Sequence, residues 1–498
     1  MAAAVNIRLD DRTLFGNDAG EDEDESVLVS YFVDQPAFAP FLDPGEDLRV
    51  ATGRKGTGKS ALLVRFAHDL RASAERPIVL HLVPSSLAAL KEPPATDNTV
   101  LLENYWKQVI CGAINMELAR DIGFAWKDDQ IALVEAAEVA GFKGKNLVSA
   151  LVSRLIGKIS LGGVVDLAPA AAKPAANPEQ LLQRVTRVMH EGGSKRRVWF
   201  LLDDIDTNFQ NSPAQQAYIS TFFSVCRALR REIAGLGIRA TVRSDVWSSL
   251  GAEHLDKVKQ YMTTLSWSAS LQKTILAQRI AAYLRRNAPG SPQAGWTVAE
   301  HEDALIELAF ARRMKWGNAA VPPAHVVRVL GGGRPRWMTQ LCRQAGVMAA
   351  RDRAERIGIQ HINQVMGDFG SNRLADLYKE HDHQFPDLKR LVESFNGGAR
   401  RYATGELLQR IEAMYLKVTP AEKIPAVDGT AYRDARQLAH FLYKCGFING
   451  NNRDDARLDR PEFVSFDTRP GLLEVDTNLD DGMAWEIQPA YRNILRVA

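Results

Sequence analysis

The chain has 498 residues, of which 46% are hydrophobic and 24% charged, with a formal net charge of +2. This length exceeds a single hydrophobic core, so we expect about three domains. The near-neutral net charge argues neither for nor against the binding of nucleic acid, because a protein with this net charge can still have a local basic face. No apolar run is long enough for a membrane span, and the N-terminal residues lack the apolar core of a signal peptide. We therefore expect a cytoplasmic protein without membrane contact.

The first predicted elements form a β-loop-α-β unit. The acidic run 21–25 is interpreted as a solvated helix start or an irregular segment. After it, residues 48–52 predict a short strand, 60–74 a helix, and 78–83 a buried strand. This order is typical of the beginning of a parallel sheet.

The middle of the chain predicts more helices and two further strands. Residues from about 85 to 195 are interpreted as a mostly helical insertion, which includes a low-complexity linker at 168–176. Strands are predicted at 198–202 and 238–242, on either side of a helix at 214–232. Together with the first two strands, they predict an α/β fold built on one parallel sheet.

The C-terminal half changes to helices and then to a mixed module. Helical patterns recur at 269–286, 298–313, 322–330, 334–351 and 359–380. The last 110 or so residues mix short helices with strand signals, which predicts a compact α+β module. The expected parts are an N-terminal segment, an α/β core, a helical block and a terminal module, at 1–47, 48–265, 266–383 and 384–498.

The sequence between the first strand and the first long helix matches a phosphate-binding pattern. Gly53-Arg-Lys-Gly-Thr-Gly-Lys59-Ser60 fits G-x-x-x-x-G-K-[ST]. The glycines let successive N–H groups turn towards phosphate oxygens, and the helix start adds its positive dipole end. Lys59 is predicted to contact the β- and γ-phosphates of ATP, and the Ser60 hydroxyl to coordinate Mg²⁺. The predicted ATP-binding set is Gly53, Arg54, Lys55, Gly56, Thr57, Gly58, Lys59, Ser60 and Ala61.

Two carboxylates follow the apolar strand at 198–202. Asp203 is predicted to join Ser60 in the magnesium site, and Asp204 to polarise the attacking water. Asp206 either supports the site or caps the next helix, and we expect the cap. Because Asp204 stands where many fast ATPases carry a longer glutamate, slow hydrolysis is expected.

Two arginines are candidates for sensing the γ-phosphate. Arg243 ends the strand at 238–242, where it would either sense phosphate or form a structural ion pair with Asp245. Arg336 opens a helix after a glycine turn, a position at which the helix dipole disfavours positive charge. A phosphate group would resolve that conflict, so Arg336 is predicted to contact the nucleotide. The predicted catalytic set is Lys59, Asp203, Asp204, Arg243 and Arg336.

In combination, these motifs resemble an AAA+/STAND-type P-loop ATPase. "FLLDDID" resembles the Walker B element of bacterial KAP-like ATPases, and "GRKGTGKSALL", "VRSDVW" and "GRPRWMTQLCRQA" are similar to bacterial P-loop ATPases, some encoded in antiphage-defence loci. The resemblance covers roughly residues 12–350, and implies a helical lid at 266–383 with Arg336 as its second sensor. The long insertion and the missing Walker B glutamate depart from the pattern of this family.

The terminal module also resembles a winged helix, with 435–445 as its second helix and wing strands within 463–487. In origin-recognition-type ATPases such a domain binds DNA. Here arginines and aspartates are interleaved, which favours a protein partner but leaves DNA open. The arginines concerned are Arg433, Arg436, Arg453, Arg457 and Arg460.

We therefore predict an oligomeric molecular switch that binds ATP and Mg²⁺ between sheet and lid and hydrolyses ATP slowly. Its output would be the assembly or control of a protein effector, in prokaryotic antiphage defence. The alternative is a DNA-binding, origin-recognition-like AAA+ loader or remodeller. A scaffold that binds ATP without hydrolysing it is a third possibility.

Overall fold

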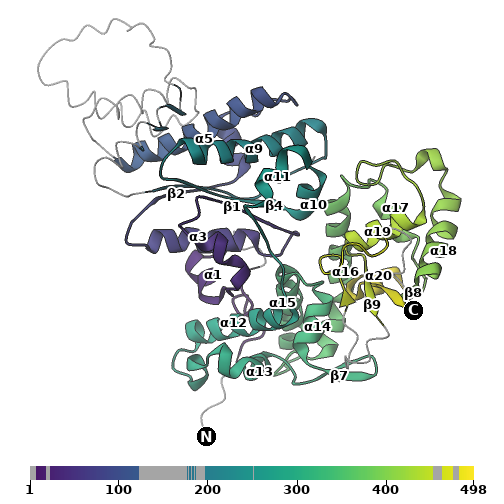
Figure 1. The fold of residues 1–498 in the computed structure, drawn as a ribbon. Helices are drawn as coiled ribbons and strands as arrows, with labels where there is room; N and C mark the ends of the chain where they lie inside the picture. Colours follow the sequence, from purple (N-terminus) through teal and green to yellow (C-terminus); the bar gives the residue numbers. More distant parts are fainter. Residues whose placement is uncertain are drawn as a thin grey trace, which may run out of the picture. The chain divides into compact units, whose positions relative to one another are not determined.

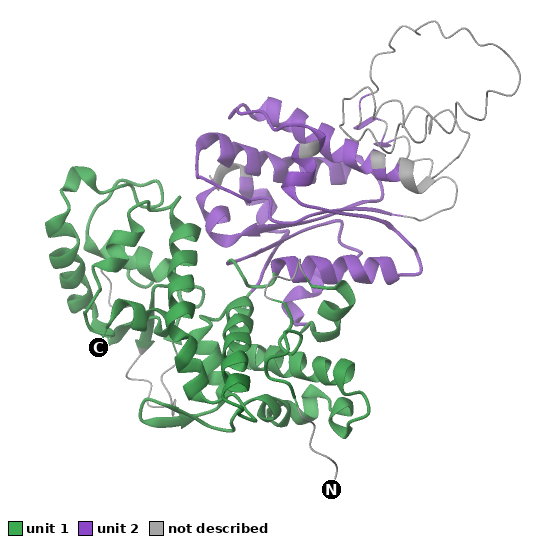
Figure 2. Ribbon diagram, turned by 180° about the vertical axis from the view of Figure 1, so that it is seen from behind, with its two compact units in different colours: residues 1–33, 55–58, 266–498 green, residues 34–54, 59–265 purple. Residues whose placement is uncertain are grey.

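The computed structural model describes residues 7–17, 23–122, 177, 179–180, 182–183, 186, 197–250, 252–452, 463–474 and 482–497. The described chain forms two units (Figure 2). Unit 1 contains residues 1–33, 55–58 and 266–498, and unit 2 contains residues 34–54 and 59–265. The predicted linker at 168–176 and most of the predicted insertion lie outside the described residues.

Unit 2 is built on a parallel sheet of five strands (Figure 1). The strands are β1 (Leu48–Gly53), β2 (Ile78–Leu82), β3 (Val198–Leu202), β4 (Leu236–Arg243) and β5 (Met262–Thr264). Their order is β2-β3-β4-β1-β5, and every pairing is parallel. The predicted α/β fold is thereby confirmed. Because the strands are parallel, β1, β3 and β4 all deliver the residues that follow them to one edge of the sheet.

Helices cover both faces of this sheet. Helix α3 (Lys59–Ala72) lies on one face, and α5 (Thr99–Ile122) and α9 (Pro213–Glu232) lie on the other (Figures 1 and 2). Helix α9 starts where the Ser212 side chain accepts a hydrogen bond from the Gln215 N–H, which satisfies one of the donors left free at a helix start. The shorter elements of this unit are η2 (Pro36–Phe38), α2 (Ala39–Leu42), α4 (Pro84–Leu90), α10 (Ser244–Ser249) and α11 (Ala252–Lys259).

The face that α3 covers is filled by large aromatic side chains. Trp199 of β3 packs edge-to-face on Phe66 of α3, with ring centroids 4.9 Å apart. On the neighbouring strand β4, Gly237 leaves room for the Trp199 ring, because a Cβ atom at that position would lie 2.4 Å from a ring carbon. The glycine is therefore required by the close approach of an indole ring.

Replacing Gly237 by alanine should destabilise unit 2 by about 1–3 kcal/mol, the usual cost of overpacking a core. The Trp199 ring is buried and packs on Phe66, so a shift of the ring would disturb that contact. Urea denaturation monitored by tryptophan fluorescence would measure the change. Gly367→Ala is the matched control, because a Cβ atom there meets no heavy atom within 4 Å. Equal stability of the two variants would contradict the role given to Gly237.

Unit 1 contains the predicted block of helices. These are α12 (Ala269–Asn287), α13 (Val298–Ala309), α14 (Pro323–Leu330), α15 (Pro335–Arg351) and α16 (Ile359–His381). The predicted helix at 298–313 ends early, because a hairpin of β6 (Met314–Trp316) and β7 (Ala319–Val321) follows it. The N-terminal residues belong to this unit as well, since Leu14 and Phe15 join its core and α1 (Glu25–Tyr31) begins at the capping Asp24.

The terminal module of unit 1 is α+β. Its elements are α17 (Leu388–Glu393), β8 (Arg401–Ala403), α18 (Thr404–Met414), α19 (Ala435–Lys444), β9 (Ile448–Asn452), β10 (Phe463–Val464), β11 (Met483–Ile487) and α20 (Pro489–Leu495). The strands form an antiparallel sheet in the order β10-β9-β11-β8. Helix α19 is the third helix of the module, rather than the predicted second one. Its assignment as a winged helix stays a prediction, and Arg453, Arg457 and Arg460 lie outside the described residues.

All four cysteines are buried and free of disulfides. No described helix has both the length and the apolar character needed to cross a membrane. The domain boundaries expected from the sequence stay predictions.

Candidate nucleotide-binding site

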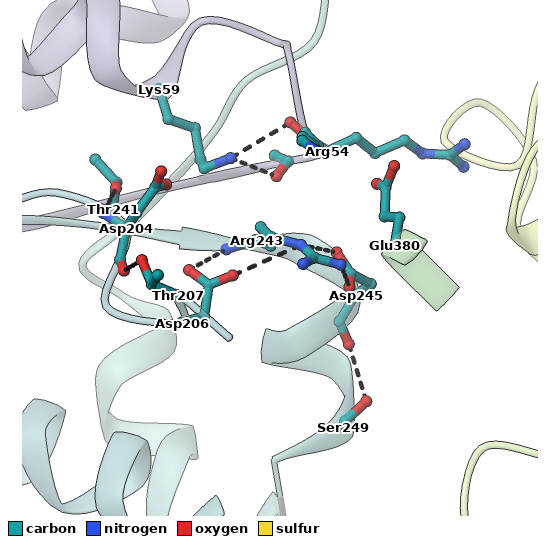
Figure 3. A network of polar contacts seen from close by, with 12 residues as sticks. Arg54, Lys59, Asp204, Asp206, Thr207, Thr241, Arg243, Asp245, Ser249 and Glu380 are labelled. Atoms are coloured by element: carbon teal, nitrogen blue, oxygen red, sulfur yellow. Dashed lines mark hydrogen bonds and ion pairs between the residues drawn. The ribbon is translucent and has the colours of Figure 1, made fainter. Parts of the chain in front are cut away.

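The predicted phosphate loop connects β1 to α3. Gly56 and Gly58 have positive φ angles of 80° and 101°, which residues with a Cβ atom rarely adopt. The loop thus needs glycine where the pattern has it. Lys59 is buried, and its Nζ donates hydrogen bonds to the carbonyl oxygens of Gly53 at 3.2 Å and Arg54 at 3.4 Å (Figure 3). An ammonium group held by the backbone of the loop is placed to meet a phosphate bound there.

Asp203 and Ser60 come together, as the sequence predicts for two magnesium ligands. The Asp203 side chain hydrogen-bonds to the Ser60 hydroxyl and accepts a second hydrogen bond from Thr241 Oγ1 at 2.5 Å. Burial, and then the charge of Asp204, raise the pKa of Asp203 to about 6. A bound cation would offset both effects. Thr241 was not predicted from the sequence, although it shares a strand face with Arg243 by the two-residue repeat of β4.

Asp204 occupies a sharp turn directly after the magnesium candidate. Its φ is 49°, in the left-handed region that asparagine and aspartate tolerate better than other residues with a side chain. The turn is held by the Asp204 N–H, which donates to Thr241 Oγ1 at 2.7 Å. Asp204 lies on the same side of the strand ends as Lys59 (Figure 3). The geometry is compatible with the predicted contact to an attacking water.

Asp206 contacts Arg243 instead of capping helix α9, so the expected cap is wrong. Helix α9 begins seven residues later and is capped by Ser212. The Asp206 side chain is buried, and its Oδ1 accepts a hydrogen bond from the Arg243 N–H at 3.3 Å. Its Oδ2 lies 3.6 Å from Arg243 Nε and accepts no hydrogen bond within the described chain. Only the D-D-x-D spacing after an apolar strand could have indicated this position.

Arg243 is held by two carboxylates. Its Nε donates to Asp245 Oδ1 at 3.1 Å, its Nη2 donates to Asp245 Oδ2, and Asp206 lies on the other side (Figure 3). The ion pair with Asp245 that the sequence left open is thus present. Contact with a phosphate stays a prediction, and it would require Arg243 to exchange or share these partners.

Burial, opposed by Lys59 and Arg243, raises the pKa of Asp206 from 3.8 to about 7. A carboxyl group whose pKa is raised on folding contributes stability below pH 4 that is lost as the pH rises to 7. Asp206→Asn should therefore raise the melting temperature at pH 8 and change it little at pH 4. The expected gain is on the order of 1 kcal/mol or more, since one pKa unit corresponds to about 1.4 kcal/mol. Thermal scans from pH 4 to pH 8 would measure it, and a lower melting temperature at pH 8 would contradict it.

Within unit 1, the start of α15 contacts the tip of the phosphate loop. The Arg336 N–H donates to the Gly56 carbonyl oxygen at 3.2 Å, and a Cβ atom at Gly56 would lie 3.0 Å from Arg336 Cβ. Arg336 is therefore adjacent to the predicted loop, whereas its contact with a nucleotide stays a prediction. The neighbouring Arg334 is buried, and no role was predicted for it.

The residues brought together fit ATP and Mg²⁺. A loop with left-handed glycines leaves its N–H groups accessible to phosphate, and Lys59 supplies a positive charge beside it. The Asp203 carboxylate and the Ser60 hydroxyl are hard oxygen ligands, which Mg²⁺ prefers. Among the described residues, no cluster of histidine, cysteine and carboxylate side chains forms another candidate metal site.

Comparisons with known proteins give distant similarities. No protein-family model matches the chain. A curated protein of Escherichia coli (strain K12), "Putative transposon gamma-delta 80.3 kDa protein", is 20% identical over 450 residues. The match includes 87% of this chain, and the chain spans 61% of the length of that relative.

Three solved structures are similar over most of their length. Cdc6p from Pyrobaculum aerophilum is 11% identical, with coverage of 95% of this chain and 98% of that one and a TM-score of 0.33. The Aeropyrum pernix ORC1 protein in complex with DNA is 16% identical, with 97% and 95% covered and a TM-score of 0.33. The Aeropyrum pernix ORC2 protein is 14% identical, with 90% and 88% covered and a TM-score of 0.40.

With TM-scores this low, the fold must be assigned from the chain itself. The evidence is the five-stranded parallel sheet, the glycine loop between β1 and α3, and the Asp203–Ser60 contact across the strand ends. By its fold, the chain is an α/β P-loop NTPase.

Proposed function

We propose that this protein binds ATP with Mg²⁺ and hydrolyses it slowly, as a nucleotide-dependent switch. The observation that carries the proposal is the hydrogen bond between Asp203, at the end of β3, and Ser60, at the start of α3. These residues are 143 positions apart in the sequence, and the fold brings together the two side chains expected to bind one metal ion. Lys59 lies beside them with its ammonium group turned into the loop.

Each residue has a distinct proposed role. Asp203 and Ser60 would hold the magnesium ion, which supplies charge neutralisation for the phosphates when bound. Lys59 would bind the β- and γ-phosphates, and the loop N–H groups would orient them. Asp204 would accept a proton from the attacking water. Arg243 and Arg336 would respond to the γ-phosphate.

Titration of the full chain with a fluorescent ATP analogue, with and without Mg²⁺, tests the binding. Binding should depend on Mg²⁺, since Asp203 and Ser60 are its proposed ligands. Phosphate release should be slow, because the short Asp204 carboxylate limits its reach to water. Absence of Mg²⁺-dependent binding would refute the proposal, and rapid release by the isolated protein would refute slow hydrolysis.

For the output of the switch, we favour DNA over a protein effector. The terminal module runs helix, strand, helix, helix and strands from α17 to β11, the order that a winged helix requires. One similar structure, that of the Aeropyrum pernix ORC1 protein, is in complex with DNA. The chain would then act as an origin-recognition-like AAA+ loader or remodeller.

Gel-shift titrations at several salt concentrations would test DNA binding. Affinity that falls steeply with salt is expected when Lys and Arg neutralise DNA phosphates. Salt-independent or absent binding would favour a protein effector instead. Oligomer formation, a cytoplasmic location and a role in antiphage defence rest on the sequence resemblance, and a nuclease or toxin gene beside this one would support the defence role.

A further inference from the structure

Arg334 is a buried cation at the start of α15, directly beside the phosphate loop. Its Nη1 donates to Glu380 Oε2 at 2.7 Å, and the two side chains are only 5% and 1% exposed. The same nitrogen donates to the Lys55 carbonyl oxygen at 3.3 Å. The guanidinium group also lies over the Trp337 ring, 4.3 Å from its centroid. A backbone carbonyl of the loop is thus bound by an arginine that is itself fixed on two sides.

Stability alone is a weak explanation for this pair. Removing two charges from water costs about as much as their attraction returns, so apolar residues of similar volume would often serve as well. Arg334 also stands at a helix N-terminus, where the helix dipole opposes a positive charge. What an apolar pair could not provide is the directed hydrogen bond to Lys55. The pair is therefore better explained by its effect on the loop than by its contribution to stability.

Helix α16 holds the same loop residue a second time. Lys55 Nζ lies 3.6 Å from Asp376 Oδ1, one helical turn before Glu380. Asp376 is in turn held by Arg373, whose Nη2 lies 3.1 Å from its Oδ2. The side chain of Lys55 is thus paired directly with α16, and its backbone is linked to the same helix through Arg334 and Glu380.

The end of α16 is itself fixed to the terminal module. His381, next to Glu380, contacts Gln384 through its Nδ1 at 2.6 Å. Gln384 Nε2 donates to Asp428 Oδ1 at 2.7 Å, and Lys444 Nζ of α19 donates to Asp428 Oδ2 at 2.6 Å. Glu380 is therefore a firmly placed anchor, which is what a residue that orients a neighbour requires.

We propose that Arg334 and Glu380 are positioning residues that hold residues 55–58 of the phosphate loop in the conformation that accepts ATP. The inference rests on the proposed function and deepens it, because it assigns loop geometry to a pair that would not touch the nucleotide. A loop that is already held in place loses less conformational entropy when ATP binds, so its affinity for ATP is higher.

Two conservative variants test the pair. Glu380→Gln keeps the shape and an acceptor but removes the charge, and Arg334→Lys keeps the charge but loses the planar fork. Each should raise the Kd and KM for Mg²⁺-ATP about tenfold, a factor equal to the loss of roughly 1.4 kcal/mol. The kcat should change by less than about twofold, since the pair does not act on the reacting atoms. Hydrogen exchange of the amides in 55–58, measured without nucleotide, should become faster.

Glu486→Gln is the matched control. Glu486 accepts from Arg492 Nη2 at 2.8 Å in the terminal module, with no contact to the loop among the interactions described. It should change neither ATP affinity nor exchange at 55–58. Circular dichroism would confirm that all variants fold.

The outcomes separate the inference from the proposed function. Unchanged exchange at 55–58 in folded Glu380→Gln and Arg334→Lys would overturn the inference, while wild-type ATP binding would still support the function. If the wild type did not bind Mg²⁺-ATP, the proposed function would be refuted. The binding titration shows this independently of the hydrogen-exchange measurement. A fall in kcat with unchanged KM would also overturn positioning of the loop.

Discussion

Lys59→Met should weaken the binding of Mg²⁺-ATP by at least about 100-fold. Hydrogen bonds to charged groups contribute about 1.5–3 kcal/mol each, and the loss of roughly 3 kcal/mol corresponds to that factor. Methionine has nearly the length of lysine, so the buried space that Lys59 fills stays occupied. The loop carbonyls of Gly53 and Arg54 lose a donor, but the fold of unit 2 should persist. Isothermal titration calorimetry with ATP and Mg²⁺ would measure the change.

Arg65→Met is a suitable control for charge on the same helix. Arg65 lies on α3 beyond the loop, where it pairs with Asp34 at 3.5 Å and Asp69 at 2.9 Å. Partly exposed ion pairs of this kind contribute at most about 1 kcal/mol to stability. The control should bind ATP as the wild type does. Equal affinity of Lys59→Met and the wild type would exclude the phosphate loop as the binding site.

The sequence predicts most of the sheet because local patterns determine its strands. The apolar runs ending at Leu202 and Val242 are buried on both sides of a parallel sheet, and such strands read as continuous hydrophobic segments. The phosphate loop is equally local, because positive φ angles at Gly56 and Gly58 demand glycine. Its flanking strand and helix could therefore be placed within one or two residues.

Features that depend on distant pairing were missed. Strand β5 has only three residues, of which two are threonine, and it becomes a strand through its pairing with β1. The strands of the β6–β7 hairpin are as short, and the predicted helix was extended to residue 313, although α13 ends at Ala309. Short strands carry too little alternation to be recognised without their partners.

Arg239 shows why side-chain environments were harder to predict than elements. It lies in β4 with no exposed surface, and its guanidinium group is within 5.5 Å of the Phe41, Phe66 and Trp199 ring centroids. It donates to the backbone carbonyls of Phe41 and Asp43. A charged side chain in a strand is normally predicted to be exposed to solvent. Only the folded arrangement supplies the carbonyls and rings that accommodate this one, and the Arg334–Glu380 pair was missed for the same reason.

Asp204→Asn should reduce ATP hydrolysis by about 100-fold or more while leaving ATP affinity within about twofold, because general bases contribute about 10²–10⁴ to rates. Asparagine tolerates the left-handed φ of 49° as well as aspartate does, so the turn should be preserved. The N–H of residue 204 would still donate to Thr241 Oγ1. The substitution removes the negative charge of residue 204 and, with it, the ability to accept a proton. Single-turnover phosphate release, compared with titration of a fluorescent ATP analogue, separates chemistry from binding.

The same turn offers a physical reason for aspartate where a faster enzyme would carry glutamate. The left-handed backbone conformation is less favourable for glutamate than for aspartate or asparagine. Asp204→Glu would therefore bring the carboxylate closer to the water but destabilise the turn. We expect Asp204→Glu to have a lower melting temperature than Asp204→Asn. Hydrolysis by Asp204→Asn at the wild-type rate would show that another group accepts the proton, and the buried Asp206 would then be the first to test.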